Sequence, residues 1–175
     1  MSNILILYST TDGHTREICQ RLKVVVEHEQ HKVTLASIKD SSDLDLRPFD
    51  KVVVGASIRY GKHSPLVTEF INRNEEALNA KPNAFFSVNV VARKPEKSRP
   101  ETNPYMRKYL QKISWRPRQL AVFAGKIDYP SYGFFDRSII RFIMWMTHGP
   151  TQSDAAIDFT DWRKVDEFGK LIAGM

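Results

Sequence analysis

Ile4-Leu-Ile-Leu-Tyr-Ser-Thr-Thr-Asp-Gly-His-Thr15 is the stretch of this 175-residue sequence that decides its fold. An apolar run without alternation passes abruptly into hydroxyl residues, and a helical spacing of apolar residues begins at Gly13. Such a run is typical of a strand covered on both faces, as in a parallel sheet. The helix that follows offers free backbone N–H groups and the positive end of its dipole. The stretch therefore predicts a strand, an anion-binding turn and a helix.

The residues of the turn favour a monophosphate as its ligand. Hydroxyl groups donate hydrogen bonds to phosphate, and a glycine lets the backbone come close to it. No lysine follows the glycine as in a triphosphate loop, and the chain contains no Gly-x-Gly, so the dinucleotide fingerprint is excluded. An ordinary capped turn is the alternative. The residues that we expect to contact the phosphate are Ser9, Thr10, Thr11, Asp12, Gly13, His14 and Thr15.

This turn resembles the FMN phosphate loop of flavodoxins, whose pattern is apolar-apolar-aromatic-x-Thr-x-x-Gly-x-Thr. The matching residues are Ile6, Leu7, Tyr8, Thr10, Gly13 and Thr15. The sequence departs from the family at Cys19, where flavodoxins usually have alanine. The resemblance implies a flavodoxin-like fold with FMN as the cofactor.

Strands and helices alternate along the rest of the chain. We expect strands at 31–37, 50–57, 83–91 and 120–125, and helices at 13–30, 64–78, 105–113 and 161–172. This alternation predicts an α/β fold with a doubly wound, five-stranded parallel sheet, and the flavodoxin resemblance implies strand order 2-1-3-4-5. A long insertion at about 126–156 interrupts the fifth strand, which residues 157–159 resume. We expect residues 1–175 to form a single domain.

Two further loops follow the third and fourth strands, at the edge where open parallel sheets bind ligands. The flavodoxin resemblance implies that both loops flank the isoalloxazine ring. Tyr60 would stack on the ring, and Arg59 or Arg93 near N1 would stabilise the reduced anion, so these two arginines are the tentative catalytic residues. Solvated loop residues without such roles are the alternative, and no general base is identified. The residues concerned are Ser57, Ile58, Arg59, Tyr60, Gly61, Asn89, Val90, Val91, Ala92 and Arg93.

The net charge of +6 is concentrated in one segment, residues 91–118. This segment holds nine basic and two acidic residues, so its charge is +7 and the rest of the chain sums to about −1. Electron-shuttle flavodoxins are typically acidic, which argues against a simple shuttle. A basic segment interleaved with aromatic residues binds nucleic acid, anionic lipid or a substrate bearing carboxylates. A solvated basic face is the alternative.

The insertion contains an amphipathic helix, residues 134–147, that is rich in Phe, Ile, Met and Trp and flanked by arginines. Fourteen residues span roughly 21 Å as a helix, which is too short to cross an apolar layer of about 30 Å. The composition suits a helix that lies in a membrane interface. A dimer contact, or packing on the protein's own core, is the alternative.

Several segments together are similar to the menaquinone-dependent protoporphyrinogen IX dehydrogenases of enterobacteria. They are Val54–Gly61, Ser87–Lys97, Trp115–Pro117, Ala124–Gly125 and Thr160–Trp162. This resemblance implies FMN-dependent oxidation of protoporphyrinogen IX in haem biosynthesis, with electrons passed to menaquinone or ubiquinone. We expect a peripheral protein on the cytoplasmic face of the inner membrane, held there through 134–147, with a homo-oligomer possible and no nucleic-acid partner. The substrate propionates would pair with Arg93, Lys94 and Lys97.

Two other functions are consistent with the sequence. One is an NAD(P)H:quinone reductase of the same fold, and the other is a basic binding module without flavin. A receiver domain is excluded, because it needs acidic residues beyond strand one and an aspartate at the end of strand three. The single cysteine excludes a disulfide framework and fits a reducing compartment. No metal site is predicted, because the histidines lack ligand spacing.

Overall fold

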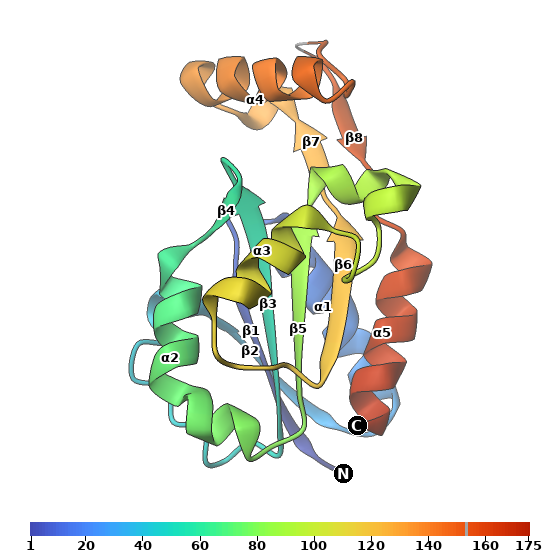
Figure 1. Ribbon diagram of the computed structural model, residues 1–175. Helices are drawn as coiled ribbons and strands as arrows, with labels where there is room; N and C mark the ends of the chain where they lie inside the picture. The colour runs from blue at the N-terminus through green and yellow to red at the C-terminus, as the bar shows by residue number, and fades with distance from the viewer. Residues whose placement is uncertain (153) are drawn as a thin grey trace.

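Five parallel strands form the central sheet of the computed structural model, which describes residues 1–152 and 154–175 (Figure 1). The strand order across the sheet is β2-β1-β3-β5-β6. When only the five parallel strands are numbered along the chain, this order is 2-1-3-4-5. The predicted doubly wound order is therefore confirmed. These strands are β1 (Asn3–Ser9), β2 (Lys32–Ser37), β3 (Lys51–Arg59), β5 (Asn83–Asn89) and β6 (Gln119–Ala124).

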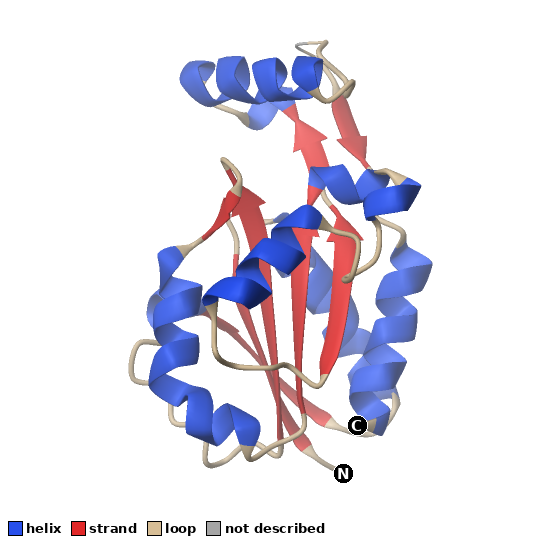
Figure 2. Cartoon of the chain, viewed as in Figure 1, coloured by secondary structure: helices blue, strands red, loops and turns tan. Residues whose placement is uncertain are grey.

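Helices cover both faces of the sheet (Figure 2). The side chains of Leu5 and Leu7 pack with α2 (Pro65–Asn79) and α3 (Pro104–Lys112). Ile4 and Ile6 point to the opposite face and pack with α1 (His14–His28) and α5 (Trp162–Gly174). Because successive strand residues face opposite layers, a strand between two helical layers is apolar at every position, as the opening stretch is.

Two strand ends differ from the prediction. The strand expected at 83–91 ends at Asn89, because the Asn89 side-chain oxygen accepts a hydrogen bond from the Ala92 N–H (3.2 Å) and starts a 3₁₀ turn, Val90–Arg93. After β3 the chain makes a short hairpin, and β4 (Lys62–His63) pairs antiparallel with the end of β3. This hairpin was not predicted, since two residues carry no periodicity.

The insertion after β6 does not return to the sheet in the predicted way. The expectation that 157–159 resume the fifth strand was wrong: β8 (Ala156–Asp158) pairs antiparallel with β7 (Lys126–Asp128) in a separate two-stranded ribbon. Pairing with β7 satisfies the backbone of the returning chain while the ribbon extends beyond the sheet. The ribbon carries α4 (Phe134–Met146) across the carboxyl ends of the parallel strands (Figure 1).

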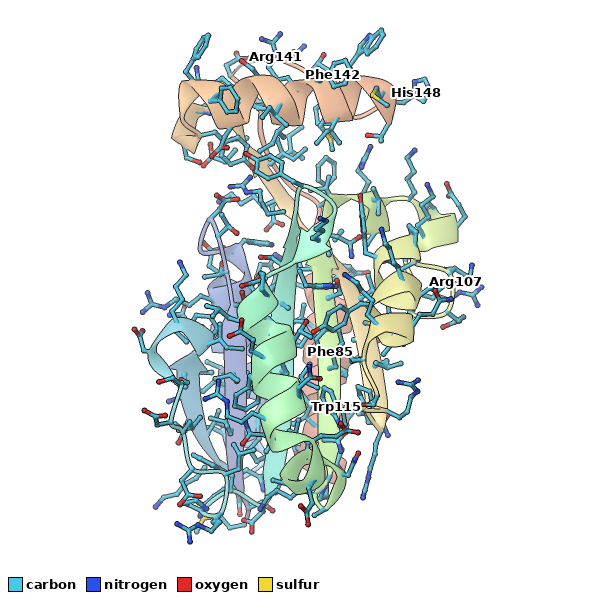
Figure 3. The ribbon with its side chains drawn as sticks, turned by 60° about the vertical axis from the view of Figure 1, so that its left-hand side comes forward. Phe85, Arg107, Trp115, Arg141, Phe142 and His148 are labelled. Atoms are coloured by element: carbon cyan, nitrogen blue, oxygen red, sulfur yellow. The ribbon has the colours of Figure 1, made fainter. Side chains whose placement is uncertain are left out.

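An aromatic cluster between the sheet and α3 encloses one histidine. Phe85 and Trp115 lie in this core (Figure 3), and Tyr109 stacks on Phe85 with ring centroids 5.4 Å apart. The ring of His63 lies 4.5 Å from that of Tyr109, and its Nε2 lies 2.9 Å from the Ser87 hydroxyl. Burial, and secondarily the charge of Lys112, lower the pKa of His63 from 6.5 to about 4.

This shift predicts a loss of stability in mild acid. Below about pH 6.5 the unfolded chain binds a proton at His63 that the folded protein excludes until about pH 4, so the free energy of unfolding falls across this window and is unaffected above it. We expect wild type to lose on the order of 2–3 kcal/mol more than His63→Gln between pH 7 and pH 4. Urea unfolding of both proteins at pH 7, 5.5 and 4 measures the difference. Parallel pH profiles would contradict the prediction.

Candidate functional site

A cleft opens where β1, β3, β5 and β6 end, and residues of α4 line its far side. Figure 1 shows α4 lying beyond this edge of the sheet. Most residues predicted to bind the cofactor line this cleft together, although they come from three separate loops. The exceptions among the predicted residues are Ser9, Gly13, Ala92 and Arg93. The predicted residues that line the cleft are Thr10, Thr11, Asp12, His14, Thr15, Ser57, Ile58, Arg59, Tyr60, Gly61, Asn89, Val90 and Val91.

The turn after β1 has the geometry of an anion site. Gly13 adopts φ +90°, a left-handed conformation that glycine tolerates best, and α1 begins at the next residue with no side chain capping it. The Thr10 hydroxyl accepts a hydrogen bond from the Gly13 N–H (2.9 Å) and so fixes the turn. The Thr15 hydroxyl, on the first turn of α1, is buried and has no hydrogen-bond partner among the described residues. A buried donor without a partner costs free energy, so this hydroxyl fits an acceptor such as phosphate.

His14 ties the same turn to the end of the insertion. Its Nε2 lies 2.6 Å from the Thr160 hydroxyl and 3.6 Å from an Asp158 carboxylate oxygen, and its Nδ1 lies 3.1 Å from the Glu17 carboxylate. The Thr160 hydroxyl is in turn 2.8 Å from the Ala124 carbonyl oxygen at the end of β6. The phosphate-type turn, β6 and the returning strand β8 therefore form one hydrogen-bonded unit.

Arg59 neutralises the charge of an acidic residue in the cleft. Its guanidinium donates a hydrogen bond to the Asp12 carboxylate (2.6 Å) and lies 5.4 Å from the ring centroid of Tyr132. Burial raises the pKa of Asp12, whereas the charge of Arg59 acts in the opposite direction. The ion pair thus reduces the negative charge that the loop would otherwise present to a phosphate.

The tip of the loop after β3 is hydrogen-bonded to α4. Tyr60 (φ +50°) and Gly61 (φ +77°) form a left-handed turn between β3 and β4. The Tyr60 hydroxyl donates a hydrogen bond to the Asp136 carboxylate of α4. The loop predicted to flank the ring is therefore positioned partly by the insertion.

Arg93 lies outside the lining of the cleft and is engaged with the backbone. Its guanidinium donates hydrogen bonds to the Val90 carbonyl (3.0 Å) and to the Thr147 carbonyl (3.2 Å) just after α4. Burial lowers its pKa. Lys94 and Lys97 do not line the cleft either. A role of these three residues in substrate binding stays a prediction.

Several residues that line the cleft were not predicted. Gly125 and Lys126 follow β6, whose carboxyl end opens on the same edge as the other strands, so the topology rule already pointed to them. The α4 residues among them are spaced i, i+3 and i+4, which is the pattern of one helix face. The local sequence gives no indication that this face lies over the cleft. The unpredicted residues are Val88, Tyr105, Gly125, Lys126, Ile127, Tyr132, Ile140, Ile143 and Met144.

α4 is apolar on two faces. Its inner face, Ile140, Ile143 and Met144, lines the cleft. The opposite face is exposed, and Figure 3 shows that the segment bearing Arg141, Phe142 and His148 lies at the far end of the molecule from the core residues Phe85 and Trp115. Within the described residues, no helix is long and apolar enough to cross a membrane. The large exposed side chains of α4 and their exposed fractions are Phe134 (85%), Phe135 (74%), Phe142 (60%), Trp145 (68%) and Met146 (60%).

Comparisons with known proteins agree with this architecture. The family model of the flavodoxin domain matches residues 5–154. The protoporphyrinogen IX dehydrogenase [quinone] of Escherichia coli K12 is 43% identical over 97% of this chain and 93% of its own length. A protein of the same name from Leishmania major is 42% identical over 98% of this chain and 74% of its own length. Among solved structures, an archaeal flavodoxin covers 98% of this chain and 96% of its own, with a TM-score of 0.56 and 17% identity.

Proposed function

This chain belongs to the flavodoxin domain family, and on that premise we propose that it oxidises protoporphyrinogen IX to protoporphyrin IX in haem biosynthesis, with FMN as cofactor and a quinone as electron acceptor. The relatives that carry this name match almost the whole chain, including the insertion. The structural observation that supports the cofactor is the Thr15 hydroxyl, which is buried beside the uncapped start of α1 and has no hydrogen-bond partner in the part of the chain that the structure describes.

The phosphate of FMN would be held by the turn after β1. Thr10, Thr11 and Thr15 supply hydroxyl groups, and the first backbone N–H groups of α1 supply the remaining donors. The ring would lie between the loops after β3 and β5, where Tyr60 and Asn89 line the cleft. Those two loops and the turn meet at one edge of the sheet, which suits a ligand with a phosphate at one end and a flat ring at the other.

Bound FMN would supply two-electron chemistry: in each of three rounds the porphyrinogen would lose a hydride and a proton, and the two electrons would pass on to a quinone, which takes up two protons. The protein binds and orients the cofactor and the substrate and shields them from water. Ile140, Ile143 and Met144 cover the cleft and exclude water from it. Arg59 brings a positive charge into the cleft, and its pairing with Asp12 fixes its position. The two ring-flanking loops each carry an arginine, and Arg59 lines the cleft whereas Arg93 does not. We therefore assign the electrostatic stabilisation of the reduced flavin to Arg59.

We further propose that α4 lies in the membrane interface on the cytoplasmic face of the inner membrane. One face of this helix lines the cleft, and its other face exposes four aromatic side chains. Large exposed apolar patches mark interaction sites, and aromatic residues suit the boundary between water and lipid. A lipid-dissolved quinone, menaquinone or ubiquinone, would then reach the cleft beside α4 without crossing water.

An anaerobic spectrum tests the proposed reaction. The purified, FMN-loaded protein is mixed with protoporphyrinogen IX and then with a menaquinone analogue. We expect the flavin absorbance to bleach and then return when the quinone is added, while porphyrin fluorescence appears. A flavin that stays oxidised with protoporphyrinogen but bleaches rapidly with NADPH would instead assign the chain as an NAD(P)H:quinone reductase. A protein that cannot bind FMN would point to the basic binding module.

A further inference from the structure

A second cavity, of about 440 Å³, lies between α2 and α3. Its volume is within the range of small-molecule sites. Ile58, Gly61 and Tyr105 line both this cavity and the FMN cleft, so the two adjoin at the turn between β3 and β4. We call the second cavity the α2–α3 groove. A ligand at this side of the FMN cleft would therefore lie next to the groove.

The floor of the α2–α3 groove is firmly built. Tyr109 is buried against Phe85, and its hydroxyl lies 3.0 Å from the Thr68 hydroxyl, which joins α3 to α2. His63 lies between the Tyr109 ring and the Ser87 hydroxyl. Because the aromatic and polar groups of this floor are already packed or hydrogen-bonded to one another, the binding capacity of the groove resides in its rim.

Three lysines make the rim of the groove basic. Lys62 comes from β4, and Lys108 and Lys112 lie one turn apart on the same side of α3. Glu69 of α2 is the acidic residue in the lining. None of the ion pairs found among the described residues involves these lysines. Three ammonium groups are thus available to an anionic ligand beside the redox cleft.

We propose that the α2–α3 groove binds the propionate groups of the tetrapyrrole while its macrocycle lies in the FMN cleft. The assignment rests on the proposed function, because it takes the substrate from there. The two acid chains leave one edge of the macrocycle, and an ammonium rim adjoining the cleft matches that edge in charge. Arg93, by contrast, already donates to two carbonyls, and Lys94 and Lys97 line neither the cleft nor the groove.

The test compares two porphyrins that differ only in their acid groups. Protoporphyrin IX and its dimethyl ester are titrated into FMN-loaded protein, and binding is followed by porphyrin absorbance. The groove variant is K62Q/K108Q/K112Q, which keeps good helix formers on α3. A control variant of equal charge change, K32Q/K39Q/K170Q, alters exposed lysines that line neither cavity. K94Q/K97Q tests the rival location.

We expect the groove variant to weaken binding of the free acid about tenfold and to leave binding of the ester unchanged. The KM for protoporphyrinogen should rise by a similar factor, while FMN affinity and the thermal midpoint stay as in the control variant. Wild-type affinity for the free acid in the groove variant, or the full loss in K94Q/K97Q instead, would overturn the assignment. If wild type itself neither binds porphyrin nor oxidises protoporphyrinogen, the proposed function fails and the groove assignment fails with it. If the groove variant turns over normally with an unchanged KM, only the groove assignment fails.

Discussion

Thr15→Val should weaken FMN binding by roughly 10- to 100-fold, because the phosphate loses a hydrogen bond to a hydroxyl that the fold has already buried. Hydrogen bonds to charged groups are worth more than those between neutral partners. Valine has the shape of threonine and the same restricted side-chain rotation, so the turn keeps its conformation. Titration of the FMN-free protein with FMN, followed by quenching of flavin fluorescence, measures the change.

The same substitution should leave the FMN-free protein at least as stable as wild type. Without phosphate the buried Thr15 hydroxyl finds no partner among residues 1–152 and 154–175, and a methyl group in its place removes the cost of this unpaired donor. Urea unfolding of both FMN-free proteins measures this. Thr15→Ser is the matched control, since it keeps the hydroxyl and should retain most of the affinity. Equal FMN affinity in wild type and Thr15→Val would show that this hydroxyl does not contact the phosphate.

Replacing the four exposed aromatic residues of α4 by glutamine should reduce binding to phospholipid vesicles by at least 100-fold. Each buried aromatic side chain contributes about 1.5–3 kcal/mol, so the loss of four exceeds this factor even if each inserts only partly. Glutamine preserves helix propensity, and the substituted side chains point away from the cleft, so FMN content should be unchanged. Vesicle co-sedimentation measures binding. The substituted residues are Phe134, Phe135, Phe142 and Trp145.

The chain offers a matched control for this experiment. Val24, Leu66 and Leu171 are exposed apolar residues on α1, α2 and α5, and their replacement by glutamine should leave vesicle binding unchanged. Reduction of a lipid-dissolved quinone should fall in the α4 variant, whereas reduction of a short-chain, water-soluble quinone should continue. Vesicle binding equal to wild type would contradict the membrane assignment. A wild-type dimer that the α4 variant converts to monomers would assign the exposed face to a second copy instead.

The strands and the first turn could be predicted from the sequence because the patterns that indicate them lie within a few neighbouring residues. The apolar run from Ile4 to Leu7 needs two covering layers, and Gly13 marks a turn that requires a left-handed residue. The flavodoxin resemblance then supplied the strand order, and the structure placed most of the predicted cofactor residues around one cleft.

Features that depend on distant packing escaped prediction. The returning segment is too short to show a period, so the pairing of Ala156–Asp158 with β7 instead of the sheet had no sequence signal. Nothing in the sequence indicates that the Arg93 guanidinium donates a hydrogen bond to a carbonyl 54 residues away, just after α4. The α2–α3 groove joins Lys62 to Lys112, which meet only after β4 and α3 have packed against the same core.

The hydrogen bonds from Tyr60 to Asp136 and from His14 to Thr160 have a thermodynamic consequence for the molecule at work. Each contact joins a loop of the FMN cleft to the insertion that carries α4. If seating α4 in lipid changes how often these contacts form, it changes the affinity for FMN, and a closed thermodynamic cycle requires FMN to change the affinity for lipid by the same factor. If α4 lies in the membrane interface as proposed, loss of the flavin would then change the affinity of the protein for the bilayer.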